Sequence, residues 1–417
     1  MQDISLLIGG QAGDGVMRTA ELLGKTLNRL GLYAFVINDY QSLIRGGHNF
    51  CKVRASDRQV WSHLEAVELI AALNQGTISR HEKELTEGGR VLFDSDAAKY
   101  EGPHKPLPIP LSSMVKRVGG VPIMRNSAMI GAIAHLYGLP LGPVNEVLIW
   151  GYEKKAEKNI TLAKMGYDHA KQNFDPILKL ELVKRDSTPF ISGAEAVSLG
   201  AVKAGVKVYI AYPMTPSTGI LSFMGTHQGQ LGVVVVHPEN EIGVANMALG
   251  AGYAGARCMV GTAGGGFALM QEAFSMAGQS EIPAVFVVGQ RPAPAVGVPT
   301  YTAQADLRFV LHAGHGEFPR VVVAPGDPEE SFVKAGEVMN LAWKYQVPAI
   351  ILMDKHLIES YVSIAIDERK VTVEPNSVAE SWEGEYKRYK FTDSGVSPIT
   401  FPGTPGAVVK VSSYEHD

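Results

Sequence analysis

Apolar runs rich in valine and isoleucine recur along this chain, and nearly every one is followed by a loop and a helical pattern. Four such runs follow one another at residues 207–211 (KVYIA), 232–237 (GVVVVH), 257–261 (RCMVG) and 284–289 (AVFVVG). Repeated strand–helix–strand order favours parallel sheets covered by helices. The sequence therefore predicts an α/β protein with doubly wound, mostly parallel sheets.

The chain is long enough for at least two domains, because 417 residues with 46% hydrophobic content exceed one ordinary core. A first domain is expected over residues 1–185, where the strand ISLLIGG leads through the loop QAGDG into an amphipathic helix. A second is expected over residues 186–365, and Ser192 and Glu195 have the spacing of a capping box at its first helix. Residues 366–417 are rich in proline, glycine, serine and charge, which predicts an irregular connector.

Charge and cysteine usage exclude several classes of protein. The net charge is -4, with 38 basic and 42 acidic residues interspersed, so we expect no nucleic acid and no membrane surface as partners. The N-terminal MQDIS lacks the basic region of a signal peptide, which favours a cytoplasmic location. Cys51 and Cys258 are too isolated to hold an iron–sulfur cluster or zinc, and His312 and His315 lack an evident third ligand. We expect no metal site made by this chain alone.

The loops after the four strands of the second domain carry different chemical groups. Ligands of open parallel sheets bind outside the carboxyl ends of the strands, so these loops should act together. The loop groups are the hydroxyls of Thr215 and Ser217, the carboxylates of Glu239 and Glu241, the backbone amides of Gly264, Gly265 and Gly266, and the guanidinium of Arg291. Pro213 and Pro216 fix the backbone of the first loop and end its strand.

These loops resemble, in order, a known family: the 2-oxoacid:ferredoxin oxidoreductases, thiamine diphosphate enzymes that oxidatively decarboxylate 2-oxoacids to acyl-CoA. AYPMTPST, HPENEIGVANMALGAGYAGARCMVGTAGGG and VVGQRPAP resemble the α-subunit domain that holds the pyrimidine ring of the cofactor. IGGQAGDGV and LIRGGHNF resemble the γ domain, here fused ahead of α. The resemblance implies a γ-type Rossmann-like domain over 1–185 and a thiamine pyrimidine-binding domain over 186–365.

The resemblance also implies roles for single residues. Glu241 matches the glutamate that hydrogen-bonds the pyrimidine, Arg291 matches a ligand of the substrate carboxylate, and Thr215 matches a hydroxyl that contacts substrate. Taken singly, these residues are also explained as a helix-dipole acid, a surface arginine and a turn residue. The implied cofactor contacts are Tyr212, Pro213, Thr215, Glu241, Gly264, Gly265 and Gly266, with Arg45, Gly46 and Gly47 facing coenzyme A. A tight turn explains the last three equally well.

The implied reaction needs partners. The resemblance implies a β subunit that carries the diphosphate and magnesium site and a four-iron four-sulfur cluster, and ferredoxin as electron acceptor. The chain is then active only with that subunit, with a 2-oxoacid and coenzyme A as substrates. Similar fused chains continue into a further α/β domain, so residues 366–417 are expected to connect to a C-terminal domain absent here.

The leading substrate prediction is 2-oxoglutarate or a broad range of 2-oxoacids, and the alternatives are a pyruvate- or indolepyruvate-specific enzyme. A different class of protein is a non-catalytic fragment that only binds partners. A third is a nucleotide-binding redox protein that uses the GGQAGDG loop and Asp39 for NAD or FAD.

The triplet Gly13-Asp14-Gly15 within that loop mimics a magnesium motif. We interpret it as the γ-domain loop, able to bind an anion such as a phosphate of coenzyme A.

Overall fold

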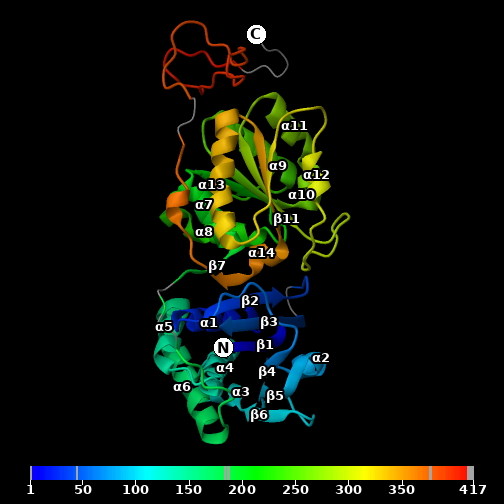
Figure 1. The fold of residues 1–417 in the computed structure, drawn as a ribbon, viewed down its shortest axis with the longest axis vertical. Coiled ribbons are helices and arrows are strands. Elements are labelled where there is room, and N and C mark those ends of the chain that lie inside the picture. Colours follow the sequence, from blue (N-terminus) through cyan, green and yellow to red (C-terminus); the bar gives the residue numbers. More distant parts are fainter. Residues whose placement is uncertain (1, 44–45, 183–184, 186–187, 375–377, 411–417) are drawn as a thin grey trace. The chain divides into compact units, whose positions relative to one another are not determined.

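The computed structural model describes residues 2–43, 46–182, 185, 188–374 and 378–410. Figure 1 shows the elements along the chain. The chain forms two compact units, Met1–Ile191 with Ser360–Ala365, and Ser192–Glu359 with Ile366–Asp417. Each unit is a β-sheet covered by helices, which confirms the predicted α/β class.

The first unit contains the following elements. Its strands are β1 (Asp3–Ala12), β2 (Tyr33–Asp39), β3 (Gly46–Ser56), β4 (Val67–Ala72), β5 (Leu85–Asp94), β6 (Lys105–Ile109), β7 (Phe190–Ser192) and β14 (Tyr361–Ser363). Its helices are α1 (Val16–Arg29), α2 (Gln75–His81), α3 (Leu111–Arg117), α4 (Arg125–Leu136), α5 (Leu141–Tyr152) and α6 (Ala156–Asn173). Short 3₁₀ turns lie at Glu82–Glu84, Pro122–Met124 and Glu153–Lys155.

The first sheet has the strand order β6-β5-β4-β1-β3-β2-β14-β7. The pairs β6–β5, β5–β4 and β4–β1 are parallel. Strand β3 is antiparallel to both β1 and β2, and β14 is antiparallel to β2. Parallel neighbours need a long crossover, and the segment 40–45 between β2 and β3 is too short to supply one. The sheet is therefore mixed where strand–helix alternation alone predicts parallel pairing.

Helix α1 packs on this sheet through the apolar spacing predicted from the sequence. Val16, Leu22, Leu23 and Leu27 are at most 3% exposed and belong to the core of the first unit. Gly31 lies just beyond the helix with φ of 92°, a left-handed conformation that glycine adopts without a steric penalty. The sequence thus places both the buried face and the end of this helix.

The second unit contains a second set of elements. Its strands are β8 (Val208–Ala211), β9 (Val234–Val236), β10 (Cys258–Ala263), β11 (Ala284–Gln290), β12 (Val321–Val323) and β13 (Pro348–Asp354). Its helices are α7 (Gly193–Lys203), α8 (Thr218–Leu231), α9 (Glu241–Tyr253), α10 (Gly264–Leu269), α11 (Gln271–Gln279), α12 (Leu307–Leu311), α13 (Pro328–Tyr345) and α14 (Lys355–Glu359). A 3₁₀ turn follows at Glu368–Lys370.

The second sheet is parallel throughout its described pairs, in the order β12-β13-β11-β10-β8-β9. From β8 the chain moves to β9 at one edge, and it then returns to β10 on the other side of β8. The point between β8 and β10 is therefore a topological switch point, where ligands of such sheets bind. The capping box at α7 is confirmed, since Glu195 N lies 3.2 Å from Ser192 Oγ and Ser192 N lies 3.0 Å from Glu195 Oε2.

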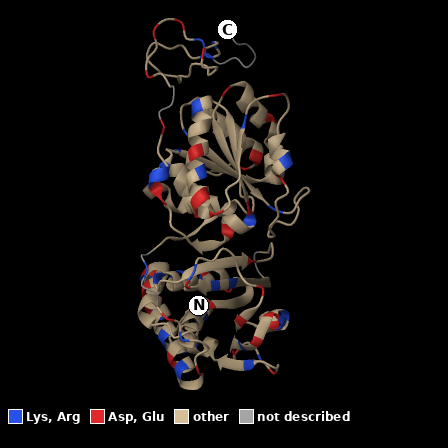
Figure 2. Ribbon diagram, viewed as in Figure 1, with Lys and Arg blue, Asp and Glu red and all other residues tan. Residues whose placement is uncertain are grey.

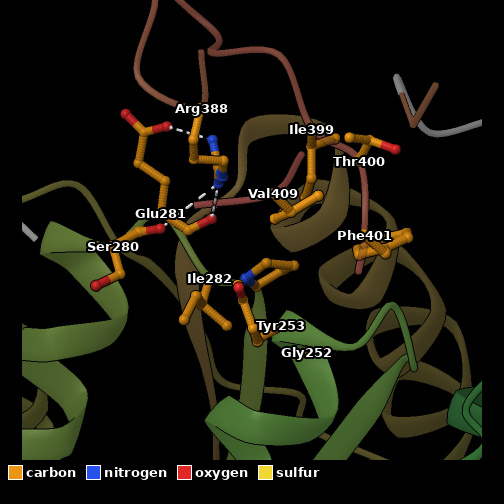
Figure 3. A pocket seen from close by; sticks show the side chains of 11 residues that line it. Gly252, Tyr253, Ser280, Glu281, Ile282, Arg388, Ile399, Thr400, Phe401 and Val409 are labelled. Carbon is orange, nitrogen blue, oxygen red and sulfur yellow. Dashed lines mark hydrogen bonds and ion pairs between the residues drawn. The ribbon is translucent and has the colours of Figure 1, made fainter. Parts of the chain in front are cut away.

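Residues 378–410, here named the C-terminal strap, lie against the second unit and have little regular structure apart from an isolated bridge between Val378 and Ile399. Arg388 is 7% exposed, and its guanidinium donates to the carboxylate of Glu281 at 3.0 Å and to the backbone oxygen of Glu281 at 2.7 Å (Figure 3). The cavity beneath the strap measures only about 10 Å³, too small for more than one water molecule. Because Glu281 precedes β11, these contacts lie at the amino end of the sheet.

Basic and acidic residues are interspersed over the helices and loops of both units, and neither charge gathers in one region (Figure 2). Among the described helices, none is both long and apolar enough to cross a lipid bilayer.

Candidate functional site

A cavity of about 570 Å³ opens at the carboxyl ends of the strands in the second sheet. Its volume is in the range of cofactor and small-molecule sites, and the segments after β8, β9, β10 and β11 all contribute to its wall. The described lining residues are Met214, Glu241, Gly264, Gly265, Ala268, Leu269, Arg291, Ala293, Pro294, Ala295, Val296, Asp306 and Phe309. The loops singled out in the sequence therefore converge on one cavity at the switch point.

Glu241 is the first residue of α9 and is only 7% exposed. Asn240 caps the helix, because its side-chain oxygen accepts a hydrogen bond from the backbone N–H of Gly243 at 2.8 Å. Because the Asn240 side chain caps the helix, the Glu241 carboxylate is not needed as a cap, and Glu241 lines the cavity. Within the described part of the chain this carboxylate accepts no hydrogen bond. A buried carboxylate is costly without a donor, and a ligand in the cavity can supply one.

The glycine run at the start of α10 makes room for acidic side chains. A methyl group on Gly264 would lie 2.6 Å from Oδ1 of Asp306, and one on Gly266 would lie 3.0 Å from Cγ of Glu241. Gly264 and Gly265 line the cavity, whereas Gly266 lies outside its described lining, beside Glu241. Three successive glycines are needed here because side chains and backbone from other segments approach the α-carbons closely.

Arg291 follows β11 and lines the same cavity, and the residue is 6% exposed. Its Nη1 donates a hydrogen bond to the backbone oxygen of Thr215 at 2.7 Å. Burial lowers the pKa of the guanidinium, and the nearby carboxylate of Asp306 opposes that shift. An arginine at the end of a strand is ordinarily a surface residue, so its burial beside a cavity is a specific feature of this site.

The loop after β8 carries Tyr212, Pro213 and Thr215, the cofactor contacts expected of this segment. Met214 lines the cavity, whereas Tyr212, Pro213 and Thr215 lie outside its described lining. The ring of Tyr212 contacts that of His237 edge-on, with centroids 6.0 Å apart. The contribution of Thr215 is its backbone carbonyl, which holds Arg291.

Asp306 is a cavity residue that the sequence analysis missed. It precedes α12 and is 6% exposed, and its backbone N–H donates to Oε1 of Gln290 at 3.2 Å. Burial raises the pKa of its carboxyl group, and the positive charge of Arg291 opposes that shift. In the sequence, an aspartate before a short helix is typical of an N-cap, which hides its position in the cavity.

The residues predicted to face coenzyme A belong to the first unit. Arg45 lies outside the described residues. Gly46 and Gly47 begin β3 with φ of 76° and 70°, left-handed conformations that favour glycine. In the neighbouring loop, Asp14 forms an ion pair with Arg125 at 2.7 Å, so the carboxylate of the Gly-Asp-Gly triplet is already engaged by protein.

The second unit has a parallel sheet with a cavity at its switch point, lined by buried carboxylates, a buried guanidinium and glycines. This arrangement is typical of α/β proteins that bind a small ligand at that end of the sheet. Residues 199–417 match the family described as pyruvate flavodoxin/ferredoxin oxidoreductase, thiamine diphosphate-binding, and residues 5–169 match the pyruvate ferredoxin/flavodoxin oxidoreductase family. The chain belongs to the 2-oxoacid:ferredoxin oxidoreductase family, and its second unit contains the thiamine diphosphate-binding domain of that family.

Individual relatives agree with this family. The chain is 30% identical to a 2-oxoacid:ferredoxin oxidoreductase subunit alpha of a Sulfolobus species, over 99% of this chain and 74% of the relative. It is 25% identical to the 2-oxoglutarate oxidoreductase subunit KorA of Mycobacterium tuberculosis, over 100% of this chain and 70% of that protein. The solved 2-oxoglutarate:ferredoxin oxidoreductase from Magnetococcus marinus, with 2-oxoglutarate, coenzyme A and succinyl-CoA bound, matches with a TM-score of 0.87 at 29% identity. That match covers 100% of this chain and 75% of the solved chain.

Proposed function

We propose that this chain is the α-type subunit of an enzyme that oxidatively decarboxylates a 2-oxoacid with coenzyme A, giving acyl-CoA, CO2 and reduced ferredoxin. The observation that carries the proposal is the buried carboxylate of Glu241, which lines the cavity at the switch point and accepts no hydrogen bond from the described residues. A ligand with a hydrogen-bond donor on the edge of a ring would satisfy it. The family relationship makes thiamine diphosphate that ligand.

The residues of the cavity fit the pyrimidine half of thiamine diphosphate. When bound, this cofactor supplies a nucleophilic carbon and accepts the electrons released by decarboxylation. Glu241 would hydrogen-bond the ring nitrogen and share a proton with it, which would favour the form of the ring whose amino group can act as a base. Gly264 and Gly265 leave the adjacent wall free of side chains, so that a flat ring can approach the backbone. The apolar remainder of the lining excludes water from the ring.

Arg291 binds the carboxylate of the 2-oxoacid in this proposal. Its planar guanidinium presents several N–H donors in a fixed arrangement, and one of them is already held by the carbonyl of Thr215 at 2.7 Å. That hydrogen bond fixes the direction of the remaining donors. The hydroxyl of Thr215 stays the proposed contact to substrate, in addition to the backbone contact of this residue with Arg291.

A second subunit completes the site. Two apolar residues that line the cavity are exposed, Leu269 at 55% and Val296 at 67%. Exposed apolar surface beside a ligand site is typical of a protein interface. We propose that a β subunit covers it and provides the diphosphate and magnesium site and the four-iron four-sulfur cluster. Cys51 and Cys258 are both buried, lie in different units and do not form a cluster site.

The first unit is proposed to face coenzyme A through Arg45, Gly46 and Gly47, of which the two glycines begin β3. Their positive φ angles favour glycine, and the space beside the α-carbon of Gly46 is open. The leading substrate is 2-oxoglutarate or a broad range of 2-oxoacids, because relatives named for both substrates align with this chain over nearly its whole length.

The test is to co-express the chain with its β subunit and to measure reduction of methyl viologen with coenzyme A and 2-oxoglutarate, pyruvate or indolepyruvate. We expect turnover that depends on thiamine diphosphate. Arg291→Ala should raise KM for the 2-oxoacid by about 10- to 100-fold, the value of a hydrogen bond to a charged group. Arg308→Ala, an exposed arginine of α12, is the matched control. A complex that assembles with its cluster and cofactor and oxidises none of the three acids would refute the proposal.

A further inference from the structure

Four polar side chains of the first unit form a connected series that the cavity of the second unit does not include. Nε2 of His48 lies 2.7 Å from Nε2 of His81, the last residue of α2, and Nδ1 of His81 lies 2.5 Å from Oε1 of Glu84. The other carboxylate oxygen of Glu84 forms an ion pair with Nζ of Lys52 at 2.8 Å. The series therefore runs in the order Lys52, Glu84, His81, His48.

His48 ends this series at a partly exposed position, whereas Lys52 and His81 are 7% and 6% exposed. His48, Phe50 and Lys52 alternate along β3 and so share one face of the strand. The ring of Phe50 contacts that of His81, with centroids 4.4 Å apart. A ligand that approaches the start of β3 would therefore meet the imidazole of His48, which has the other three polar groups behind it.

The carboxylate of Glu84 fixes where the protons of the two imidazole rings lie. Although burial opposes ionisation, the hydrogen bonds from Lys52 and His81 lower the pKa of the Glu84 carboxyl group, so it is an acceptor at neutral pH. Nδ1 of His81 therefore carries a proton, and Nε2 of the neutral ring is an acceptor. His48 then donates from its own Nε2, which leaves the lone pair of neutral His48 on Nδ1.

This lone pair of His48 is available to accept a proton. Burial lowers the pKa of His48 to about 4, and His81 and Arg80 act in the same direction, so the ring is neutral at neutral pH. No side chain among the described residues hydrogen-bonds Nδ1, and the backbone of Gly10 favours the protonated ring. A neutral imidazole with a carboxylate behind it is a common arrangement for taking a proton from a nucleophile, because the carboxylate stabilises the imidazolium.

We propose that His48 is a catalytic base of the first unit, which takes the proton of the coenzyme A thiol. His48 lies two positions after Gly46 on β3, where this ligand is proposed to bind, and the inference rests on that proposed function. The S–H bond breaks, its electron pair stays on sulfur, and the proton passes to Nδ1 of His48. His81 and Glu84 are positioning residues, which fix the tautomer of His48 and stabilise its charged form.

The experiment uses the complex with the β subunit and the variant His48→Gln, which keeps a polar side chain but cannot act as a base. We expect kcat/KM for coenzyme A to fall at least about 100-fold at neutral pH, the usual contribution of a general base. For the 2-oxoacid, kcat/KM should change less than about twofold. The matched control is His169→Gln, a partly exposed histidine of α6 outside the series, which should leave both values unchanged.

The pH profile separates a base from a residue that only supports the fold. In His48→Gln, the reaction with coenzyme A should accelerate about tenfold per pH unit below the pKa of the free thiol, because the thiolate fraction rises in that proportion. The wild type should depend much less on pH, because its base is already neutral. Glu84→Gln should cause a smaller loss, about tenfold, and should add little in a His48→Gln background.

Binding of S-methyl coenzyme A, which has no thiol proton, gives a readout that does not depend on turnover. Its dissociation constant, measured by calorimetry, should be the same in the wild type and in His48→Gln. Weaker binding of this thioether to the variant, parallel pH profiles of variant and wild type, or an equal loss in His169→Gln would overturn the inference. An inactive wild-type complex would refute the proposed function itself, whereas an active wild type with an unaffected His48→Gln variant would refute only this inference.

Discussion

Replacement of Glu241 by glutamine tests whether the proposed function depends on the ability of this side chain to carry a proton. The change keeps the length and one carbonyl oxygen of the side chain but removes its ability to carry a proton. Glu241 is 7% exposed and accepts no hydrogen bond within the described residues, so no hydrogen bond or ion pair among those residues depends on its charge. We expect the folded subunit to tolerate the substitution, and the complex with the β subunit to assemble normally.

The expected loss of activity follows from the proton that this carboxylate is proposed to share with the cofactor. A positioned acid or base contributes on the order of 10²- to 10⁴-fold to a rate, which corresponds to about 3–5 kcal/mol in the activation barrier. Thermal stability should not fall, because a neutral amide is less costly to bury than an unpaired carboxylate. The midpoint temperature of the variant is therefore expected to equal or exceed that of the wild type.

The assay compares kcat, cofactor affinity and melting temperature in the wild type, in Glu241→Gln and in a control, Glu239→Gln. Glu239 is an exposed carboxylate in the same loop, and its substitution should leave all three values unchanged. A Glu241→Gln complex that turns over within about threefold of wild type would refute the assignment of the proton-holding residue. A large loss of stability would show that the carboxylate has a structural role.

Three further predictions concern packing. Gly266→Ala should weaken thiamine diphosphate binding in calorimetry and destabilise the subunit by about 1–3 kcal/mol, because the new methyl would meet Thr262 Oγ1 at 2.3 Å; unchanged affinity would contradict this. Arg388→Ala should lower stability by roughly 1–3 kcal/mol and make the C-terminal strap more sensitive to limited proteolysis, with kcat as the unaffected readout. Neither cysteine should react with a thiol reagent at pH 8 before unfolding, because Cys51 and Cys258 are buried and burial raises the pKa of the Cys258 thiol to about 12; rapid labelling of the native protein would show otherwise.

Local signals in the sequence predict the second unit closely. Ser192 and Glu195 form the capping box expected from their spacing, and the strands expected at 257–261 and 284–289 are observed as β10 and β11. These features depend on residues that are neighbours in the chain, so periodicity and capping are sufficient to find them.

Features that depend on distant segments were not predictable in the same way. Strand β3 pairs with β1 in antiparallel direction and places Ala55 opposite Ile4, so this pairing joins segments far apart in the sequence. Asp306 enters the cavity only because Gln290 holds its backbone, a contact across sixteen residues. The signal that could have identified Asp306 is its place after a loop rich in glycine and proline that begins at the end of a strand. An aspartate in that place is also typical of an ordinary N-cap.

The order of strands in the first sheet has a practical consequence for dividing this chain. Strands β14 and β7 complete the edge beyond β2, yet β14 is supplied by residues that follow nearly all of the second unit. Expression of residues 1–185 alone would leave β2 without its neighbour Tyr361–Ser363, and an uncovered strand edge promotes association between copies. To express the first unit on its own, residues 1–185 would have to be fused to a short segment that contains β14. Ending the chain in the linker would not be sufficient.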